Sequence, residues 1–178
     1  MLCFMSPALL ITRLERFAEA LPTVAACVNE TDARWKPPSG NFSILEVIRH
    51  LIDEEREDFR ARLRMTLERA PEWPKIDPPA WVAARRYHEQ DFGASIGEFV
   101  RERTTSIAWL RCLGDPARVD WTIAYQHPTV GPVTAATLLA SWAAHDALHL
   151  RQIAKRLHEL AARDGAPNTT GYAGEWTA

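Results

Sequence analysis

Apolar side chains recur at steps of three and four residues along most of the chain, a pattern typical of helices that bury one face. The first such stretch covers residues 7–28, and its apolar series is Leu10, Leu14, Phe17, Leu21 and Val24. Ser6 and Pro7 provide a cap and a first-turn proline, and Pro22 is expected to kink or end the helix. The turn-rich stretch DARWKPPSGN that follows is predicted to be a connection.

The second predicted helix has the clearest start. Ser43 and Glu46 have the spacing of a capping box, and Phe42 and Val47 stand where a hydrophobic staple would form. We expect this helix to run from Ser43 to about Arg69. Its apolar face consists of Ile44, Ile48, Leu51, Ile52, Phe59 and Leu63.

Prolines and tryptophans interrupt the periodicity over residues 70–81, which predicts a long ordered connection. A short helical piece is expected over residues 81–90. Ser95 and Glu98 repeat the capping-box spacing and are predicted to open a third helix, with a stop at Gly114.

A loop is predicted over residues 115–132 and a fourth long helix over residues 133–162. No stretch alternates between apolar and polar residues for long enough to predict a strand. Four long helices predict an all-α protein, an up-down four-helix bundle, in which metal and ligand sites are built from side chains on facing helices.

The chain has 178 residues, of which 47% are apolar, and this fits one domain with its own core. We expect this domain to cover residues 1–163. A polar tail that carries Tyr172 and Trp176 is expected over residues 164–178.

Charge and cysteine usage exclude several classes of protein. The formal net charge of −2 gives no general attraction to nucleic acid or to an anionic membrane surface. Cys3, Cys27 and Cys112 are far apart and form no C-x-x-C pair, which favours reduced thiols. The apolar opening lacks the basic region of a secretory signal, and no apolar run reaches the roughly 18 residues of a membrane span. We therefore expect a cytoplasmic protein without nucleic-acid or membrane partners.

Two histidines on the fourth predicted helix have the spacing of a chelating pair. His145 and His149 project about 40° apart around the helix, on the same arc as Leu138, Trp142, Ile153 and Leu160. Buried imidazoles lose hydration that only hydrogen-bond partners or a metal ion can replace. A histidine bonded within the core is the ordinary alternative, but two at this spacing favour a metal ion, and a third ligand from another helix would strengthen this interpretation.

His50, on the second predicted helix, is the candidate third ligand. It projects about 100° from its neighbour Leu51, at the flank of the apolar stripe. Periodicity alone therefore favours an exposed histidine at this position.

Carboxylates follow His50 in the sequence IDEERED, and most of them are expected on a solvated face. Glu55 continues the apolar series, and Glu54 stands one turn after His50. Either one, or Asp146, could orient a ligand or take a proton from water at the metal. The spacing H-D-x-x-H differs from the H-E-x-x-H of metalloproteases, so peptidase chemistry is not supported.

The chain resembles the DinB-like (YfiT-like) superfamily of bacterial four-helix bundles over nearly its whole length. The matching stretches are WKPPSGNFSILEVIRHLIDEE and GPVTAATLLASWAAHDALHLRQI. Carried over by position, the resemblance implies that His50, His145 and His149 form a three-histidine metal site. It gives Asp53 and Gln152 supporting places around these ligands.

The resemblance also implies a cofactor and a class of activity. The cofactor would be a divalent ion, with nickel or zinc favoured and iron or manganese as alternatives, and with positions left open to water. Some relatives are S-transferases that use a low-molecular-weight thiol, and others are described as metal-dependent hydrolases. A small-molecule substrate is therefore expected, and Trp142, Tyr125 and Trp35 are candidates to line its pocket, although a core or loop role is the default for each.

Three alternatives stay open at this point. The bundle could bind metal in a stress response without catalysis, it could hold no metal, and it could form a homodimer, as relatives often do. The additional acidic residue of HLIDEE and the proline-rich connection are expected to reshape the mouth of the site. For that reason a relative's substrate does not transfer to this chain.

Overall fold

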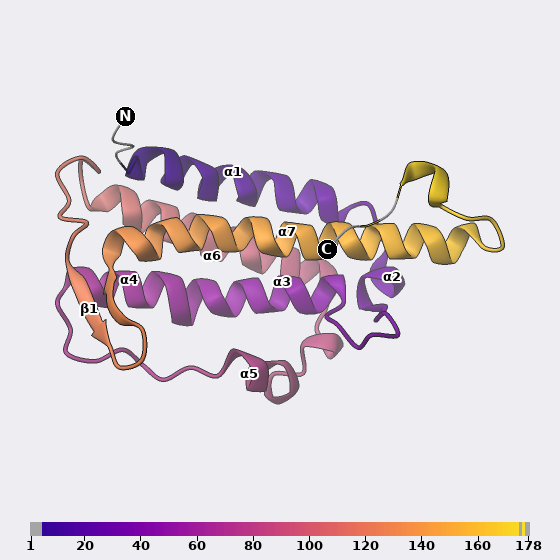
Figure 1. The fold of residues 1–178 in the computed structure, drawn as a ribbon, viewed down its shortest axis with the longest axis horizontal. Coiled ribbons are helices and arrows are strands. Elements are labelled where there is room, and N and C mark those ends of the chain that lie inside the picture. Colours follow the sequence, from indigo (N-terminus) through magenta and orange to yellow (C-terminus); the bar gives the residue numbers. More distant parts are fainter. Residues whose placement is uncertain (1–4, 175, 177–178) are drawn as a thin grey trace.

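Four long helical segments lie side by side in the computed structural model, which describes residues 5–174 and 176 (Figure 1). Residues 1–4, 175, 177 and 178, at the edges of the predicted domain and tail, lie outside the described part. The four segments are α1 (Pro7–Ala25), the continuous run α3 (Ile44–Asp53), η1 (Glu54–Phe59) and α4 (Arg60–Leu67), then α6 (Phe92–Cys112) and α7 (Ala135–Gly165). The predicted all-α four-helix bundle is confirmed.

The second and third long segments run in the same direction, opposite to α1 and α7 (Figure 1). Phe17 of α1 packs edge-on against Phe99 of α6, with ring centroids 5.8 Å apart. On the other side of α6, Arg49 of α3 pairs with Glu98, and Arg60 of α4 pairs with Glu102 further along. The bundle order is thus up, down, down, up.

A long crossover makes this parallel pairing possible. It covers residues 68–91 and includes the helix α5 (Pro78–Ala84) and the short turn η2 (Tyr87–Glu89). It returns the chain along the length of the bundle, on the outside of the second segment (Figure 1). We call residues 78–89 the strap.

Two helix starts show how local chemistry sets the boundaries. The Ser43 hydroxyl accepts a hydrogen bond from the Glu46 backbone N–H, and the Glu46 carboxylate accepts one from the Ser43 N–H, so the predicted capping box is confirmed. The predicted box at Ser95 is wrong, because α6 begins earlier, with the Asp91 side chain as its cap. Ser95 instead donates its hydroxyl to the Asp91 carbonyl, as a serine inside a helix often does.

Short elements appear where connections were expected. The stretch after α1 contains α2 (Glu30–Arg34), whose cap is Asn29. Helix α1 itself continues for one turn beyond Pro22. After α6, Gly114 adopts a φ of +89°, a conformation that favours glycine and ends the helix as predicted.

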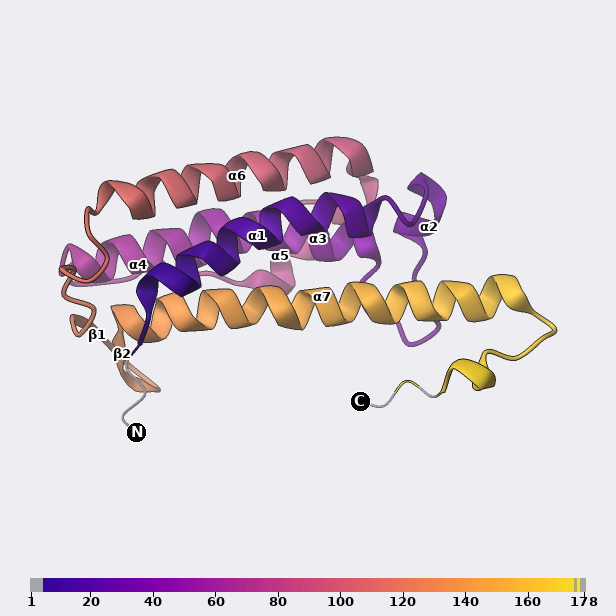
Figure 2. The ribbon, with the colours of Figure 1, turned by 90° about the horizontal axis from the view of Figure 1, so that it is seen from above.

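The loop expected over residues 115–132 contains a small antiparallel hairpin. Strand β1 (Ala124–His127) pairs with β2 (Gly131–Thr134), and a turn of residues 128–130 joins them. The expectation of no strand is corrected here, because four-residue strands are too short to show an alternating pattern. The hairpin lies at one end of the bundle, and the tail folds back beside α7 at the other (Figure 2).

Two apolar clusters form the core, and a buried arginine lies between them. Arg103 of α6 packs over the ring of Phe99 in one cluster and over the ring of Trp142 in the other, 5.1 and 5.6 Å from the ring centroids. Within the part of the chain that the structure describes, no helix has both the length and the apolar character to cross a bilayer.

Candidate metal centre

The second helix changes its winding directly after His50. Residues 54–59 form a π-helical turn, a rare form that often occurs at functional sites. Asp53, Glu54 and Glu55, at the start of this turn, are all buried, at 2%, 5% and 1% exposure. Sequence reasoning missed this turn because a run of acidic residues normally indicates a solvated face.

Three histidines meet at this level of the bundle. His50 comes from α3, and His145 and His149 come from α7. Each has a ring nitrogen that lies within 4.8 Å of the corresponding nitrogens of the other two. The Nε2 atoms of His145 and His149 are 2.9 Å apart, and the rings of His50 and His149 are separated by 4.7 Å between centroids. The structure thus brings together the three ligands that the resemblance implies.

His50 faces the core, so the exposed position that periodicity alone favours is wrong. Its side chain is only 12% exposed. The ring packs edge-on against Phe42, with centroids 6.1 Å apart, and approaches both histidines of α7. Packing of α3 against α7 turns the flank of the apolar stripe inward, which helical pitch alone does not predict.

Burial keeps the three imidazoles neutral. Burial, together with the nearby His149, lowers the pKa of His50 to about 4. Burial also lowers the pKa of His145 to about 3, with added repulsion from His149 and His50, and it lowers the pKa of His149. Neutral imidazoles are the form that binds metal ions.

The donor set fits a divalent transition metal. Three imidazole nitrogens with room for further ligands are typical of catalytic zinc sites, and imidazole also suits nickel and iron. The Nδ1 atom of His50 is buried and has no hydrogen-bond partner within the described residues; Oε1 of Glu54 is 3.8 Å away. Such an unpartnered nitrogen is costly unless another group satisfies it.

Gln152 and Glu54 surround the histidines. The amide oxygen of Gln152 lies 2.9 Å from Nδ1 of His149. A proton on that Nδ1 would bond to the amide oxygen and leave the Nε2 lone pair free for a metal ion. Burial, reinforced by neighbouring Asp58, raises the pKa of Glu54 to about 8. Glu54 can therefore accept and release a proton near neutral pH.

An open groove of about 590 Å³ leads to His50. One wall is formed by the strap and the other by α3 and the segment before it. Its lining comprises Lys36, Phe42, Glu46, His50, Pro78, Pro79, Val82, Ala83 and His88. The expectation that the proline-rich connection shapes the mouth of the site agrees with this lining.

The family of the chain follows from its sequence pattern, which matches the DinB superfamily over residues 13–153. The chain belongs to the DinB superfamily. No curated protein matches the chain.

Among solved structures, this DinB-superfamily chain is similar to YfiT from Bacillus subtilis, which is described as a probable metal-dependent hydrolase with an unusual four-helix bundle topology. The two chains share 22% sequence identity with a TM-score of 0.73, over 93% of this chain and 91% of YfiT. This likeness establishes a shared fold.

In this DinB-superfamily chain two of the acidic candidates, Glu55 and Asp146, form ion pairs with the buried Arg103. Its Nε atom donates to both oxygens of Glu55, at 2.9 and 3.0 Å. Its Nη1 and Nη2 atoms donate to the two oxygens of Asp146, at 2.7 and 2.8 Å. The Trp142 indole N–H also donates to Glu55, at 3.0 Å. Arg103 was not singled out from the sequence as a buried residue. Its position four residues after Phe99 and four residues before Ile107, on the apolar face of the helix, could have indicated its burial.

Asp53 contacts the strap, where it accepts a hydrogen bond from the Tyr87 hydroxyl. Arg85 of the strap lies 2.9 Å from the same carboxylate and 2.6 Å from Glu57. Asp53 thus anchors the wall of the groove, whereas Gln152 lies beside a histidine as the family pattern implies.

The aromatic residues that the sequence offers as pocket candidates lie elsewhere. Trp142 is buried and stacks on Phe59, Tyr125 stacks on Trp73 of the crossover, and Trp35 packs under Arg163. None of the three lines the groove at His50, where Phe42 is the aromatic residue.

Proposed function

We propose that the protein is a metal-dependent enzyme that acts on a small molecule, with a divalent ion held by His50, His145 and His149. The observation that carries this proposal is the cluster of three ring nitrogens within 4.8 Å, on neutral and largely buried imidazoles. An open groove at His50 supports an enzyme over a purely structural site. The description of YfiT as a probable metal-dependent hydrolase agrees with it.

The ion would supply Lewis-acid chemistry. His50, His145 and His149 are neutral ligands, so a divalent ion held by them would keep its full positive charge and would lower the pKa of a water molecule or a thiol bound beside it. Imidazole ligands suit nickel and zinc, the two ions that the family resemblance favours.

The protein's own residues divide the remaining tasks. Gln152 holds the ring of His149 in one tautomer. In its carboxylate form, Glu54, near His50, accepts the proton that the nucleophile gives up, and a pKa of about 8 makes this carboxylate a stronger base than an ordinary glutamate. Glu55 and Asp146 act through Arg103 as positioning residues, because their oxygens are already bonded to its guanidinium.

The reaction is either hydrolysis or transfer of a low-molecular-weight thiol to an electrophile. Both need the same polarising ion and the same proton acceptor, and they differ in the nucleophile. An open groove of about 590 Å³ is large enough for a small substrate with part of a thiol cofactor.

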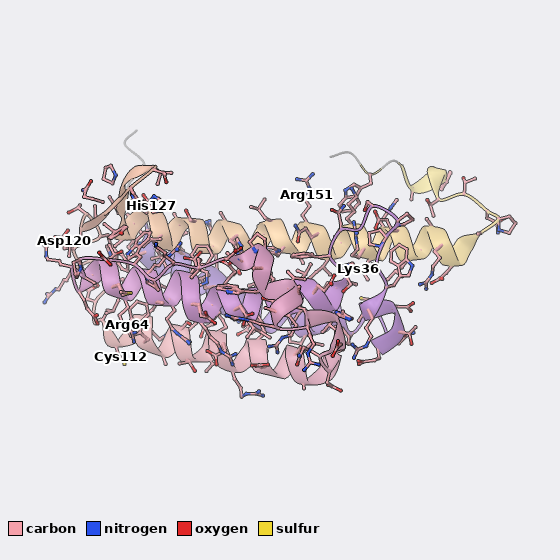
Figure 3. The ribbon with its side chains drawn as sticks, turned by 90° about the horizontal axis from the view of Figure 1, so that it is seen from below. Lys36, Arg64, Cys112, Asp120, His127 and Arg151 are labelled. Atoms are coloured by element: carbon pink, nitrogen blue, oxygen red, sulfur yellow. The ribbon has the colours of Figure 1, made fainter. Side chains whose placement is uncertain are left out.

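Elemental analysis tests the metal site. Protein purified without an affinity tag should contain about one nickel or zinc ion per chain. His50→Ala and His149→Ala should lose it, whereas His127→Ala, in the hairpin at the far end of the bundle, should keep it (Figure 3). Metal retained without His50 would contradict the three-histidine site.

Two assays then separate the reactions. Thiol consumption with a panel of electrophiles and bacterial thiols tests transfer, and release of acid from a panel of small esters and amides tests hydrolysis. Turnover in either assay should disappear in His149→Ala. A protein that binds the metal but turns over no substrate in either assay would be a non-catalytic metal-binding protein.

A further inference from the structure

A second groove lies on the other side of Phe42 from the groove at His50. Its volume is about 610 Å³. The loop before α3 forms one wall and the middle of α7 forms the other. The lining residues are Gly40, Asn41, Phe42, Leu148, Arg151, Gln152, Lys155 and Arg156. Phe42 and Gln152 connect this groove to the metal centre, because they contact His50 and His149.

This second groove is basic, although the chain as a whole is slightly acidic. Arg151, Lys155 and Arg156 contribute three cations, and only Arg156 has an acidic partner, Glu159, with Nε 3.0 Å from its carboxylate. Within the described residues, neither Arg151 nor Lys155 forms an ion pair. Figure 3 shows Arg151 pointing away from the bundle.

Arg156 has unused hydrogen-bonding capacity. Its side chain is only 4% exposed. Its Nη1 atom is buried and has no hydrogen-bond partner in the part of the chain that the structure describes. A buried guanidinium with a free donor is costly, and a carboxylate or a phosphate oxygen is the partner that its geometry fits best.

We propose that this groove binds an anionic group of the substrate, a carboxylate or a phosphate, through Arg156, Arg151 and Lys155. Arg156 follows His149 by seven residues, which places the two on one face of α7 and about 10 Å apart along its axis. A substrate of that length can hold its anionic end in the groove and its reacting end at the histidines. The inference deepens the proposed function and rests on it for assigning the anion to the substrate.

The arrangement suits one anionic group better than a polyanion. The three cations span less than two turns of one helix. Binding to nucleic acid needs many phosphate contacts along an extended surface.

Calorimetric titration of metal-free protein tests the inference, because without metal an anion cannot bind to the ion itself. The probes are inorganic phosphate and glutarate, with neutral glutaramide as the reference. Arg151→Gln with Lys155→Gln should weaken binding of at least one anion by about tenfold or more. The matched control is Arg86→Gln with Arg118→Gln, which removes the same charge from exposed side chains and should leave binding unchanged.

A second readout concerns Arg156 directly. The NMR resonance of its Nε–H group in a ¹⁵N-labelled sample should shift when the anion that binds is added. The variant Arg156→Lys should bind that anion more weakly than the wild-type protein, although the two proteins should unfold at similar temperatures. Equal weakening in the control variant, no effect of the groove variant, or no binding of either probe would overturn the proposal.

The outcome is independent of the metal test. If the wild-type protein purifies without metal but binds anions in the groove, the proposed function fails and the anion site stands. If the protein binds metal and turns over substrate but these variants bind phosphate and glutarate as before, only the anion site fails.

Discussion

Arg103 holds Asp146 through two parallel hydrogen bonds of 2.7 and 2.8 Å, and Asp146 directly follows His145 in α7. The same guanidinium bonds Glu55, next to Glu54, which lies near His50. One buried cation on α6 therefore fixes the two helices that carry the three histidines. The proposed metal ligands and the buried ion pairs of Arg103 therefore lie on the same two helices.

Replacement of Arg103 should destabilise the fold strongly. Arg103→Ala leaves two buried carboxylates without a counter-charge, and breaking a buried pair in this way costs about 3–5 kcal/mol. Urea unfolding measures the change. Arg111→Ala removes an exposed arginine from its pair with Glu15 and should cost less than about 1 kcal/mol. Equal losses in the two variants would show that the buried network contributes no special stability.

Gln152 should control metal affinity without being a ligand. In Gln152→Ala the His149 ring loses the acceptor for its Nδ1–H, and loss of such a partner typically weakens metal binding by about 10- to 100-fold. Competition with a chromophoric zinc chelator measures the affinity. Gln126→Ala, on an exposed position of the hairpin, is the control. An unchanged affinity would remove Gln152 from the site.

Glu54 should matter for turnover more than for metal binding. Glu54→Gln keeps the shape of the side chain but cannot accept a proton, and loss of a general base lowers the rate by about 10²- to 10⁴-fold. Turnover and metal content are measured on the same preparation. Glu68→Gln, at an exposed position after α4, should change neither. Loss of metal in Glu54→Gln would make Glu54 part of the ligand environment instead.

The metal-free protein should lose stability as the pH falls from 7 to 5. The pKa of His50 is lowered from its ordinary value of 6.5 to about 4 in the folded state. Between these two pH values the unfolded chain binds a proton that the folded chain does not bind, and this stabilises the unfolded state. For His50, this shift favours unfolding by about 2 kcal/mol at pH 5. Urea unfolding at both pH values should show a smaller drop for His50→Leu than for the wild type.

His88→Ala is the control for this pH effect. Its side chain is 60% exposed, and its removal should leave the pH dependence unchanged. If the wild type and His50→Leu lose the same stability between pH 7 and 5, protonation of His50 does not contribute.

The strap should open locally when its anchor is removed. Tyr87→Phe eliminates the hydrogen bond to Asp53, a contribution of about 1 kcal/mol or more because the acceptor is charged. Hydrogen exchange followed by mass spectrometry should then be faster in residues 78–89 and unchanged in α6. Tyr172→Phe, in the exposed part of the tail, should have no effect. Faster exchange throughout the bundle would mean that Tyr87 supports the whole fold.

The sequence predicts the long helices well because their burial is periodic. It also predicts the pair His145 and His149, because two ligands on one helix depend only on helical pitch. His50 required the family resemblance, since its inward orientation depends on how α3 packs against α7. Local pattern contains no information on that packing.

Other features depend on tertiary contacts that no local pattern reveals. Arg103 is buried only because Glu55 and Asp146 meet it from two other helices. The strap is placed by the contact of Tyr87 with Asp53, 34 residues apart in the chain. Periodicity indicates that Glu55 points inward, as the structure confirms, but the π-helical turn has no clear sequence signature, and the burial of Asp53 and Glu54 could not be predicted.

The strap supplies a wall of the groove but none of the three histidines. Mutations there would change the shape and polarity of the mouth, while the three proposed metal ligands stay on the long helices. An evolving lineage can therefore acquire new substrates through one surface segment, with little risk to the fold. The same division of labour recommends residues 78–89 as the place to begin when the specificity of this scaffold is redesigned.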